Sequence, residues 1–191
     1  ENPKSLGQKL GKKIIDERIT IVNATDKNNY NGEKLYGQYQ VDADGFKPDA
    51  ELTIVGKGIF KTMLNRTTPA MYAEKSTASS RIDNSPAQSV PLVGVGTLIV
   101  KAEGTTKDDN MLKTLLKAAK KQKLDYAYVI TTPRDYTSLR LYKVDVKTGE
   151  RKLVKHNRIT LPSDSQMKKF AAISDRPFVS NNVQPYTYST I

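Results

Sequence analysis

The sequence predicts an α+β fold with largely antiparallel β-sheets, one long amphipathic helix and a shorter helix near the C-terminus. Three observations lead to this prediction. Short stretches rich in β-branched residues fill the first hundred positions, with glycine turns between several of them. One segment, residues 107–123, carries apolar residues at helical spacing. Strand-like stretches then surround a Lys-Thr-Gly turn, so consecutive strands are expected to pair as hairpins.

The first half of the chain is expected to contain mainly strands. We expect strands at residues 19–22, 38–41, 51–55 and 59–64, and polar loops at 23–32 and 75–88. The glycine turn at 56–58 predicts that its two flanking strands form a hairpin. Residues 90–100 form the strongest apolar run, which favours a buried core strand. Its glycines, Gly94 and Gly96, would permit a bulge or a close backbone approach.

The long helix is expected at about Lys107 to Lys123. Thr106 followed by Asp109 predicts an N-cap start, and acidic residues near the beginning with lysines near the end suit the helix dipole. The residues that define its apolar side are Met111, Leu112, Leu115, Leu116 and Ala119.

The last third of the chain is expected to add a strand, a hairpin and the shorter helix. The strand is predicted at 125–130, and the hairpin at 139–146 and 151–155. A capping-box pattern from Ser163 to Gln166 predicts a helix that continues to about Ile173. The remaining segment is rich in Asn and Tyr and ends in strand-like sequence.

Composition excludes several kinds of chemistry. The chain of 191 residues has no cysteine, so disulfides and thiol catalysis are excluded, and His156 is its one histidine. His156 follows a basic stretch and is interpreted as a residue at a strand end rather than a metal ligand. No apolar stretch approaches the roughly 18 residues needed to span a bilayer, so no membrane partner is expected.

The net charge of +11 raises nucleic-acid binding as an alternative function. However, the 31 basic residues are spread along nearly the whole chain, and the densest runs, 117–123 and 151–155, fall in a predicted helix and hairpin. A solvated basic surface is therefore the preferred interpretation, and a nucleic-acid partner is not expected.

The segment from Gln40 to Glu51 imitates part of a calcium-binding loop. Asp42, Asp44 and Gly45 fall at the third, fifth and sixth positions, and Glu51 falls at the twelfth. The first position is an uncharged Gln, and strands rather than helices flank the segment. An Asp-Gly turn is therefore the preferred interpretation.

Three other short motifs are interpreted as incidental. Gly94-Val-Gly96 lacks a third glycine and precedes more strand, so a dinucleotide site is excluded. The sequons that begin at Asn23 and Asn65 match a common tripeptide and are not expected to carry glycans. No Ser-His-Asp arrangement has spacing support.

Several segments taken together resemble the TldD/PmbA family of bacterial zinc peptidases, which are also called modulators of DNA gyrase. The similar segments, in matching order, are 6–9, 19–23, 42–45, 52–55, 58–61, Arg81–Asn84, 112–130 and 149–154. The first fifteen residues contain no initiator Met, secretion segment or cleavage site, so we expect them to come from inside a longer protein. The resemblance implies that residues 1–191 are one C-terminal domain, without the N-terminal domain.

The resemblance also sets expectations for chemistry. The family's His-Glu-x-x-x-His zinc helix would precede Glu1, and peptidase-competent members use a cysteine near the C-terminal end as another ligand. This chain has neither, so no catalytic, cofactor-binding or metal-binding residue is assigned to it. The resemblance allows zinc in the full-length protein and assigns none to this chain. We expect the chain alone to fold without a transition metal, so that chelator leaves its melting temperature unchanged, and to lack peptidase activity.

Two functions follow from the resemblance. In the first, the chain is the C-terminal domain of a metallopeptidase that acts on peptides or unstructured proteins, with an exposed strand edge as one wall of the cleft. Residues 90–100 are one candidate for that edge, although a buried core strand is the preferred interpretation of this run. In the second, it belongs to a non-catalytic scaffold subunit that pairs with a catalytic paralogue. Homo- or heterodimers are expected in either case. A cytoplasmic location is implied, and the cell envelope stays open.

Overall fold

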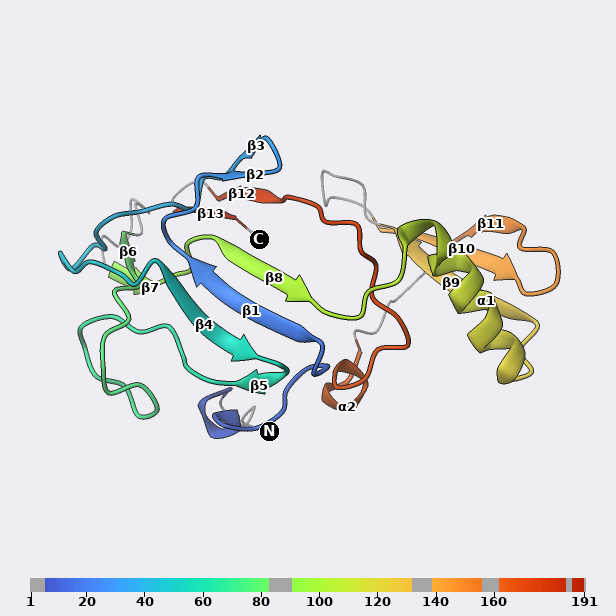
Figure 1. Cartoon of the computed structure of the whole chain (residues 1–191), viewed down its shortest axis with the longest axis horizontal. Helices are drawn as coiled ribbons and strands as arrows, with labels where there is room; N and C mark the ends of the chain where they lie inside the picture. Colours follow the sequence, from blue (N-terminus) through green and yellow to red (C-terminus); the bar gives the residue numbers. More distant parts are fainter. Residues whose placement is uncertain (1–5, 83–90, 132–138, 156–161, 185–186, 191) are drawn as a thin grey trace. The chain divides into compact units, whose positions relative to one another are not determined.

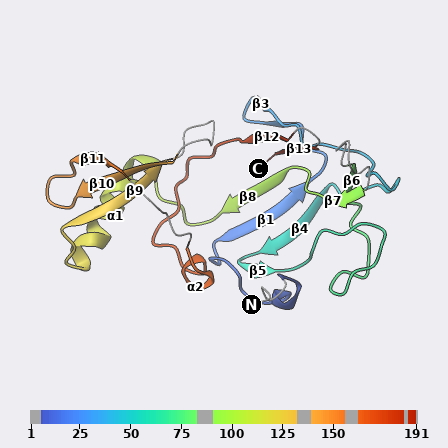
Figure 2. The ribbon, with the colours of Figure 1, turned by 180° about the vertical axis from the view of Figure 1, so that it is seen from behind.

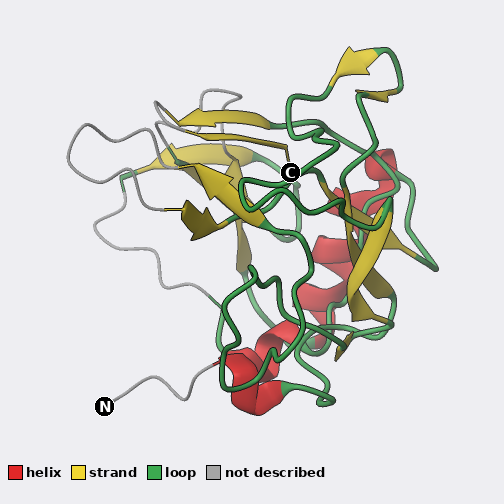
Figure 3. Cartoon of the chain, turned by 90° about the vertical axis from the view of Figure 1, so that its left-hand side faces the viewer, coloured by secondary structure: helices red, strands yellow, loops and turns green. Residues whose placement is uncertain are grey.

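The structure is a computed structural model of the chain, and it describes residues 6–82, 91–131, 139–155, 162–184 and 187–190. Strands and loops predominate over helices in this part of the chain (Figure 3). Every named strand pair described is antiparallel, so the predicted α+β fold with largely antiparallel sheets is confirmed.

Some secondary-structure elements are joined by tight turns, and others by long loops such as those between β3 and β4 and between β5 and β6. The strands are β1 (Ile19–Ala24), β2 (Asn29–Tyr30), β3 (Glu33–Lys34), β4 (Glu51–Gly56), β5 (Ile59–Phe60), β6 (Ser80–Ile82), β7 (Pro91–Val93), β8 (Leu98–Ala102), β9 (Tyr126–Thr131), β10 (Arg140–Asp145), β11 (Arg151–Val154), β12 (Asn181–Gln184) and β13 (Thr187–Thr190). The helical elements are two 3-10 turns, η1 (Leu6–Lys9) and η2 (Asp108–Asn110), and two α-helices, α1 (Met111–Lys121) and α2 (Asp164–Met167).

Contacts along the chain divide it into two compact units. Unit 1 comprises Glu1–Glu103, Met167–Lys169 and Phe178–Ile191, and unit 2 comprises Gly104–Gln166 and Phe170–Pro177. Unit 2 is therefore inserted into the sequence of unit 1. Each unit is described by itself below.

Unit 1 is built on a four-stranded sheet with the order β5-β4-β1-β8 (Figures 1 and 2). The central strand β1 pairs with β4 on one side and with β8 on the other. Its buried core includes Ile19, Val22, Val55 and Phe60, each at most 6% exposed. Burial of these apolar side chains is the main force that holds the sheet together.

Two hairpin turns in unit 1 have the backbone that a tight two-residue loop requires. Lys57 and Gly58, between β4 and β5, both have positive φ (47° and 77°), as in a type I′ turn, and this hairpin was predicted. Asn31 and Gly32, between β2 and β3, also have positive φ (51° and 86°) and form a second turn of this type. This second hairpin lies partly in the segment predicted as a polar loop.

Three other predictions for unit 1 need correction. Residues 38–41 form no strand, because the Tyr39 main chain instead donates to the Thr25 carbonyl at 3.0 Å and a turn follows at Asp42. The strand expected at 59–64 ends at Phe60, whose main chain bonds to Gly11 and Lys12. The loop expected at 75–88 contains β6, which pairs with β7, and residues 83–88 lie outside the described part.

Unit 2 contains a three-stranded sheet with the order β11-β10-β9, and α1 packs on it. Ala119 of α1 meets Ala127 of β9 and Val146 in a small buried core, and Leu115 and Leu116 pack against this core. The predicted strand and hairpin of this region are confirmed within one residue at most boundaries. Asp145 supports the hairpin turn, since its Oδ1 accepts the N–H groups of Lys147 and Thr148, each at 2.8 Å.

The long helix starts later than predicted, and its N-cap prediction is wrong. Asp108–Asn110 forms a 3-10 turn before α1 begins at Met111, and Thr106 instead makes an isolated bridge with Ser174. Asp175 caps the turn, because its Oδ1 accepts the Asp108 N–H at 2.9 Å. A side chain distant in the sequence therefore replaces the local cap.

The shorter helix is a single turn rather than a segment reaching Ile173. Its capping box is confirmed, since the Ser163 N–H donates to Gln166 Oε1 at 2.8 Å. The helix nevertheless ends at Met167, and the Ile173 carbonyl accepts the Thr106 N–H at 2.8 Å. In the described part of the chain, no helix is both long and apolar enough to cross a membrane.

Candidate functional site

The candidate site is the outer edge of β8, which forms one side of the unit 1 sheet. Among the strands that the structure describes, β8 pairs only with β1, in a register that places Ile21 opposite Val100 and Val22 opposite Ile99. Figure 1 shows β8 beside β1, with β4 on the other side of β1. The apolar run at 90–100 is therefore divided between β7 and an edge strand, and it is not the buried core strand that was expected.

Hydrogen bonds at both ends of β8 show which of its main-chain groups point outward. The Ala24 N–H donates to the Thr97 carbonyl at 2.8 Å, and the Glu103 N–H donates to the Arg18 carbonyl at 2.9 Å. Because antiparallel bonding alternates along a strand, positions 97, 99 and 101 face β1. The N–H and C=O groups of positions 98, 100 and 102 then point away from the sheet.

These outward groups have no main-chain partner among the residues that the structure describes. Val100, in the middle of the row, is 54% exposed. An edge with a row of unpaired donors and acceptors can accept another extended chain. The arrangement can therefore bind main chain, and by itself it carries out no covalent chemistry.

A contact between two glycines fixes the start of β8. A Cβ atom on Gly37 would lie 2.4 Å from the Gly96 carbonyl oxygen, which is closer than any side-chain atom can come. The side chain of Asn23, only 1% exposed, accepts the Gly96 N–H at 2.9 Å. The predicted close approach is thus confirmed, and the strand β8 follows Gly96, where a dinucleotide-binding motif would continue into a helix.

Arg81 and Tyr39 support the same junction. The guanidinium carbon of Arg81 lies 4.1 Å from the centre of the Tyr39 ring, and the Tyr39 hydroxyl donates to the Ala78 carbonyl at 2.9 Å. The Arg81 stem packs on Gly94, where a Cβ would approach it to 2.6 Å. Burial lowers the pKa of Arg81. Arg81 and Ile82 are the first two residues of the Arg-and-Asn element in the resemblance, and its last two, Asp83 and Asn84, lie outside the described residues.

The segment that imitated a calcium loop is a turn held by its own main chain. Asp42 Oδ1 accepts the N–H groups of Asp44 and Phe46, and its Oδ2 accepts the Ser80 N–H at 3.0 Å. Glu51 lies in β4 and pairs with Lys101. These carboxylates do not converge on one point, so the Asp-Gly turn interpretation holds.

Asp44 joins this turn to the segment that follows β5. Its Oδ2 accepts the Thr67 hydroxyl at 2.8 Å, and its Oδ1 accepts the Arg66 guanidinium at 3.3 Å. The hydrogen bond from Thr67, followed by smaller contributions that include the Arg66 charge, lowers the pKa of Asp44. The Asp44 carboxylate therefore holds the turn against the segment at Arg66 and Thr67.

Both sequon asparagines are buried. Asn23 is 1% exposed and Asn65 is 3% exposed. The Asn65 amide donates to the carbonyls of Ala73 and Lys75. Neither amide has room for a glycan in this fold, which supports the interpretation of the sequons as incidental.

The described residues do not fit a zinc ion. They contain no group of three or more His, Cys, Asp or Glu side chains that could hold a metal. A structural or catalytic zinc needs at least three protein ligands. His156 lies outside the described residues, and the whole chain contains no cysteine.

Comparison with known families gives one result. Residues 2–184 match the sequence model described as the PmbA/TldA metallopeptidase C-terminal domain. This range includes nearly the whole chain: all of unit 2 and most of unit 1. Comparisons with curated proteins and with solved structures give no match. Since the family model matches far more than half of the sequence, the chain belongs to the PmbA/TldA metallopeptidase family, as its C-terminal domain.

Proposed function

We propose that this domain binds an extended peptide along the outer edge of β8, as one wall of the substrate cleft of a family metallopeptidase. The observation that carries the proposal is the row of outward main-chain groups at Leu98, Val100 and Ala102. Main-chain hydrogen bonds along such an edge give affinity for extended segments of many sequences. This suits an enzyme that acts on unstructured proteins.

In this proposal the chain orients the substrate, and residues outside the chain supply the zinc. A zinc peptidase needs about three protein ligands and an open position for water. The described residues hold no such set. The domain alone would therefore bind peptide without hydrolysing it.

A second candidate function is a non-catalytic partner subunit that pairs with a catalytic paralogue. The observation that favours it is the lack of cysteine in the whole chain, since the resemblance implies a cysteine ligand in peptidase-competent members. Both functions place the edge of β8 against a peptide, but only the first predicts hydrolysis by the full-length protein without a paralogue.

The test of the β8 edge is Val100→Pro in the full-length protein. Proline removes the outward N–H at this position, and edge strands tolerate it. Loss of one or two hydrogen bonds to the peptide should raise KM for a quenched fluorescent casein peptide by about tenfold, with a smaller change in kcat. Val100→Thr is the matched control, because it keeps the N–H and the β-branched shape.

Equal KM values for the two variants would overturn the role of the β8 edge. Full-length protein that hydrolyses the peptide only after a paralogue is added would favour the partner-subunit function. In that case Val100→Pro should weaken peptide binding by the mixed complex.

A further inference from the structure

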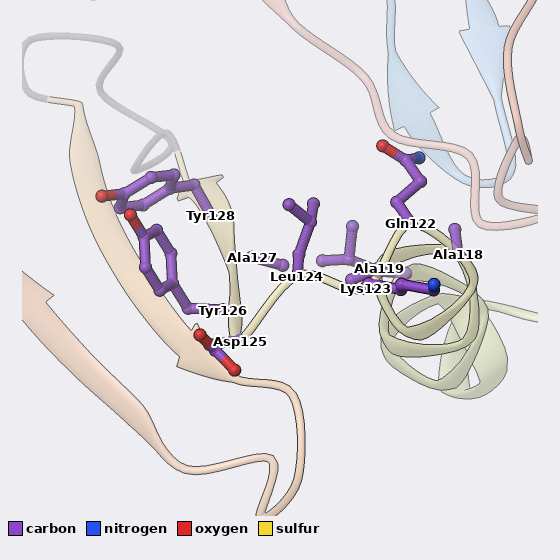
Figure 4. Close-up of a pocket in the computed structure, with 10 residues that line it drawn as sticks. Ala118, Ala119, Gln122, Lys123, Leu124, Asp125, Tyr126, Ala127 and Tyr128 are labelled. Carbon is purple, nitrogen blue, oxygen red and sulfur yellow. The ribbon is translucent and has the colours of Figure 1, made fainter.

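A second strand edge lies in unit 2, beside a groove of about 520 Å³. The groove runs between α1 and β9, and Figure 4 shows Ala118 and Gln122 on its helix side. The rings of Tyr126 and Tyr128 lie on the side of β9 away from α1 (Figure 4). The strand wall of the groove is therefore made of main chain rather than of these side chains.

The outward main-chain groups of β9 face this groove. The Val146 N–H donates to the Asp125 carbonyl at 3.0 Å, which places position 125 in a hydrogen-bonded pair with the neighbouring strand. By alternation, positions 127, 129 and 131 bond to β10, and positions 126, 128 and 130 point outward. Within the described ranges, no main-chain group pairs with these three positions.

The helix wall combines apolar side chains, two of them small, with the polar Gln122. Leu115, Ala118 and Ala119 line it, and Ala127 lies at the base of the strand wall. Leu124, 49% exposed, also lines the groove. Small residues beside an open edge leave space for the alternate side chains of an added strand.

The corner between helix and strand is fixed before any ligand binds. Lys123 adopts a left-handed backbone (φ 57°), its N–H donates to the Lys120 carbonyl at 3.0 Å, and the Leu124 N–H donates to the Ala119 carbonyl at 3.1 Å. These two bonds form a Schellman motif. A preformed groove loses little conformational entropy on binding.

Charge favours an acidic occupant. Unit 2 contains 15 Lys and Arg against 8 Asp and Glu, a net charge of +7. Two charged residues, Lys123 and Asp125, line the groove. The exposed side of α1 carries further lysines, among them Lys113, Lys117 and Lys120. The surrounding positive potential attracts acidic segments and raises their association rate.

We propose that the α1–β9 groove binds an extended acidic peptide segment. The segment adds to β9 as a fourth strand, and its alternate apolar side chains lie against Leu115 and Ala118. This site is distinct from the β8 edge, since all of its residues belong to unit 2. The apolar wall and the charge make it selective for sequence, so its ligand is a particular acidic segment.

The test uses the 191-residue chain and a fluorescein-labelled heptapeptide of alternating aspartate and valine. Fluorescence anisotropy should show saturable binding, and the same peptide with lysine in place of aspartate should bind at least about tenfold more weakly. Two N-methylated forms, on the valines or on the aspartates, provide the sharpest control. Only one set of N–H groups faces β9, so one form should lose about tenfold in affinity and the other should not.

Two variants of the chain complete the test. Ala118→Trp should fill the groove and reduce affinity by about tenfold or more, whereas Leu153→Trp, on the exposed edge strand β11, should not. The binding that Ala118→Trp removes should persist in the Val100→Pro chain, which separates the groove from any weaker binding at the β8 edge. Equal affinity of both N-methylated peptides, or wild-type binding by a folded Ala118→Trp chain, would overturn the proposal. Self-association that Ala118→Trp abolishes, without peptide binding, would assign the groove to a second copy of the chain instead.

Discussion

The strand edges of β8 and β9 share one main-chain pattern and differ in what surrounds them. Each presents three alternate residues whose outward groups lack partners in the described part of the chain. The edge strand β8 contains Lys101, and an exposed lysine in an edge strand disfavours non-specific pairing with the sheets of other molecules. β9 has no charged residue but has a helix beside it and an apolar groove between them.

The difference indicates how one fold can combine tolerance and selectivity. Main-chain hydrogen bonds are the same for every sequence, so an open edge binds extended chains with little discrimination. A groove next to the edge adds contacts that depend on side chains. In the two proposals, β8 accordingly takes a varied substrate and β9 takes a defined partner segment.

The largest expected effect is a loss of stability around β8, caused by a substitution at Gly37. In Gly37→Ala, the new methyl group would meet the Gly96 main chain at 2.4 Å, and main chain cannot move aside cheaply. We expect a loss of about 3 kcal/mol in the free energy of unfolding, measured by urea denaturation. Hydrogen exchange should show β8 amides opening while β9 amides keep their protection.

Gly56→Ala is the matched control in the same sheet. Its Cβ would find only ordinary contacts, the nearest being the flexible Lys61 side chain at 3.4 Å. The change should lie within about 1 kcal/mol of zero. If both alanine variants unfold alike, the glycine contact does not position β8.

A middle-sized effect concerns pH and the start of α1, on the β9 side. The hydrogen bond from Ser174 at 2.7 Å, and then the Arg176 guanidinium, lower the pKa of Asp108. A depressed folded pKa stabilises the fold above the unfolded pKa of about 4, and this contribution is lost as the pH falls through the folded value. The protection factors of the amides at the start of α1, taken relative to the intrinsic exchange rates at each pH, should therefore fall below about pH 4.

Asp108→Asn should remove most of this acid sensitivity by abolishing the titrating group. Asp109→Asn, at the neighbouring exposed position, is the control and should keep it. An identical pH profile in wild type and Asp108→Asn would show that the contact with Ser174 and Arg176 contributes nothing to the helix start.

The smallest effect concerns the corner of the groove. Lys123 holds a left-handed conformation that glycine adopts without strain, so Lys123→Gly should stabilise the chain by up to about 1 kcal/mol. The same substitution at Lys117, within α1, should destabilise it by about 1 kcal/mol. Thermal melts of the two variants should shift in opposite directions, and a shared direction would contradict the assigned corner.

Local pattern predicted much of the fold. Apolar spacing predicted α1, and β-branched runs predicted β1, β4 and β9, because these segments bury one side against a neighbour. The β2–β3 hairpin carried a usable signal, since Asn31-Gly32 is a common type I′ pair. β6 carried none, because its three residues form a strand only through pairing with β7.

The candidate sites were harder to predict than the fold. Whether the run that ends in β8 lies at the centre or the edge of a sheet depends on strands far away in the sequence. The small residues Ala118 and Ala119 fit a buried helix side equally well, so their pattern could not indicate a groove. The zinc expectation rested on residue counts for the whole chain, and the structure leaves it as a prediction.

The insertion of unit 2 into unit 1 has a consequence for the order of folding. The Asn181 side chain donates to the Lys34 carbonyl at 2.7 Å, a bond between residues 147 positions apart. The sheet and helix of unit 2 lie in one continuous stretch, so their loop-closure entropy is small and they should form early. Unit 1 cannot be completed until the segment around Asn181 has been synthesised and has bonded to residues near Lys34. During synthesis, the α1–β9 groove would therefore be complete while unit 1 is still unfinished.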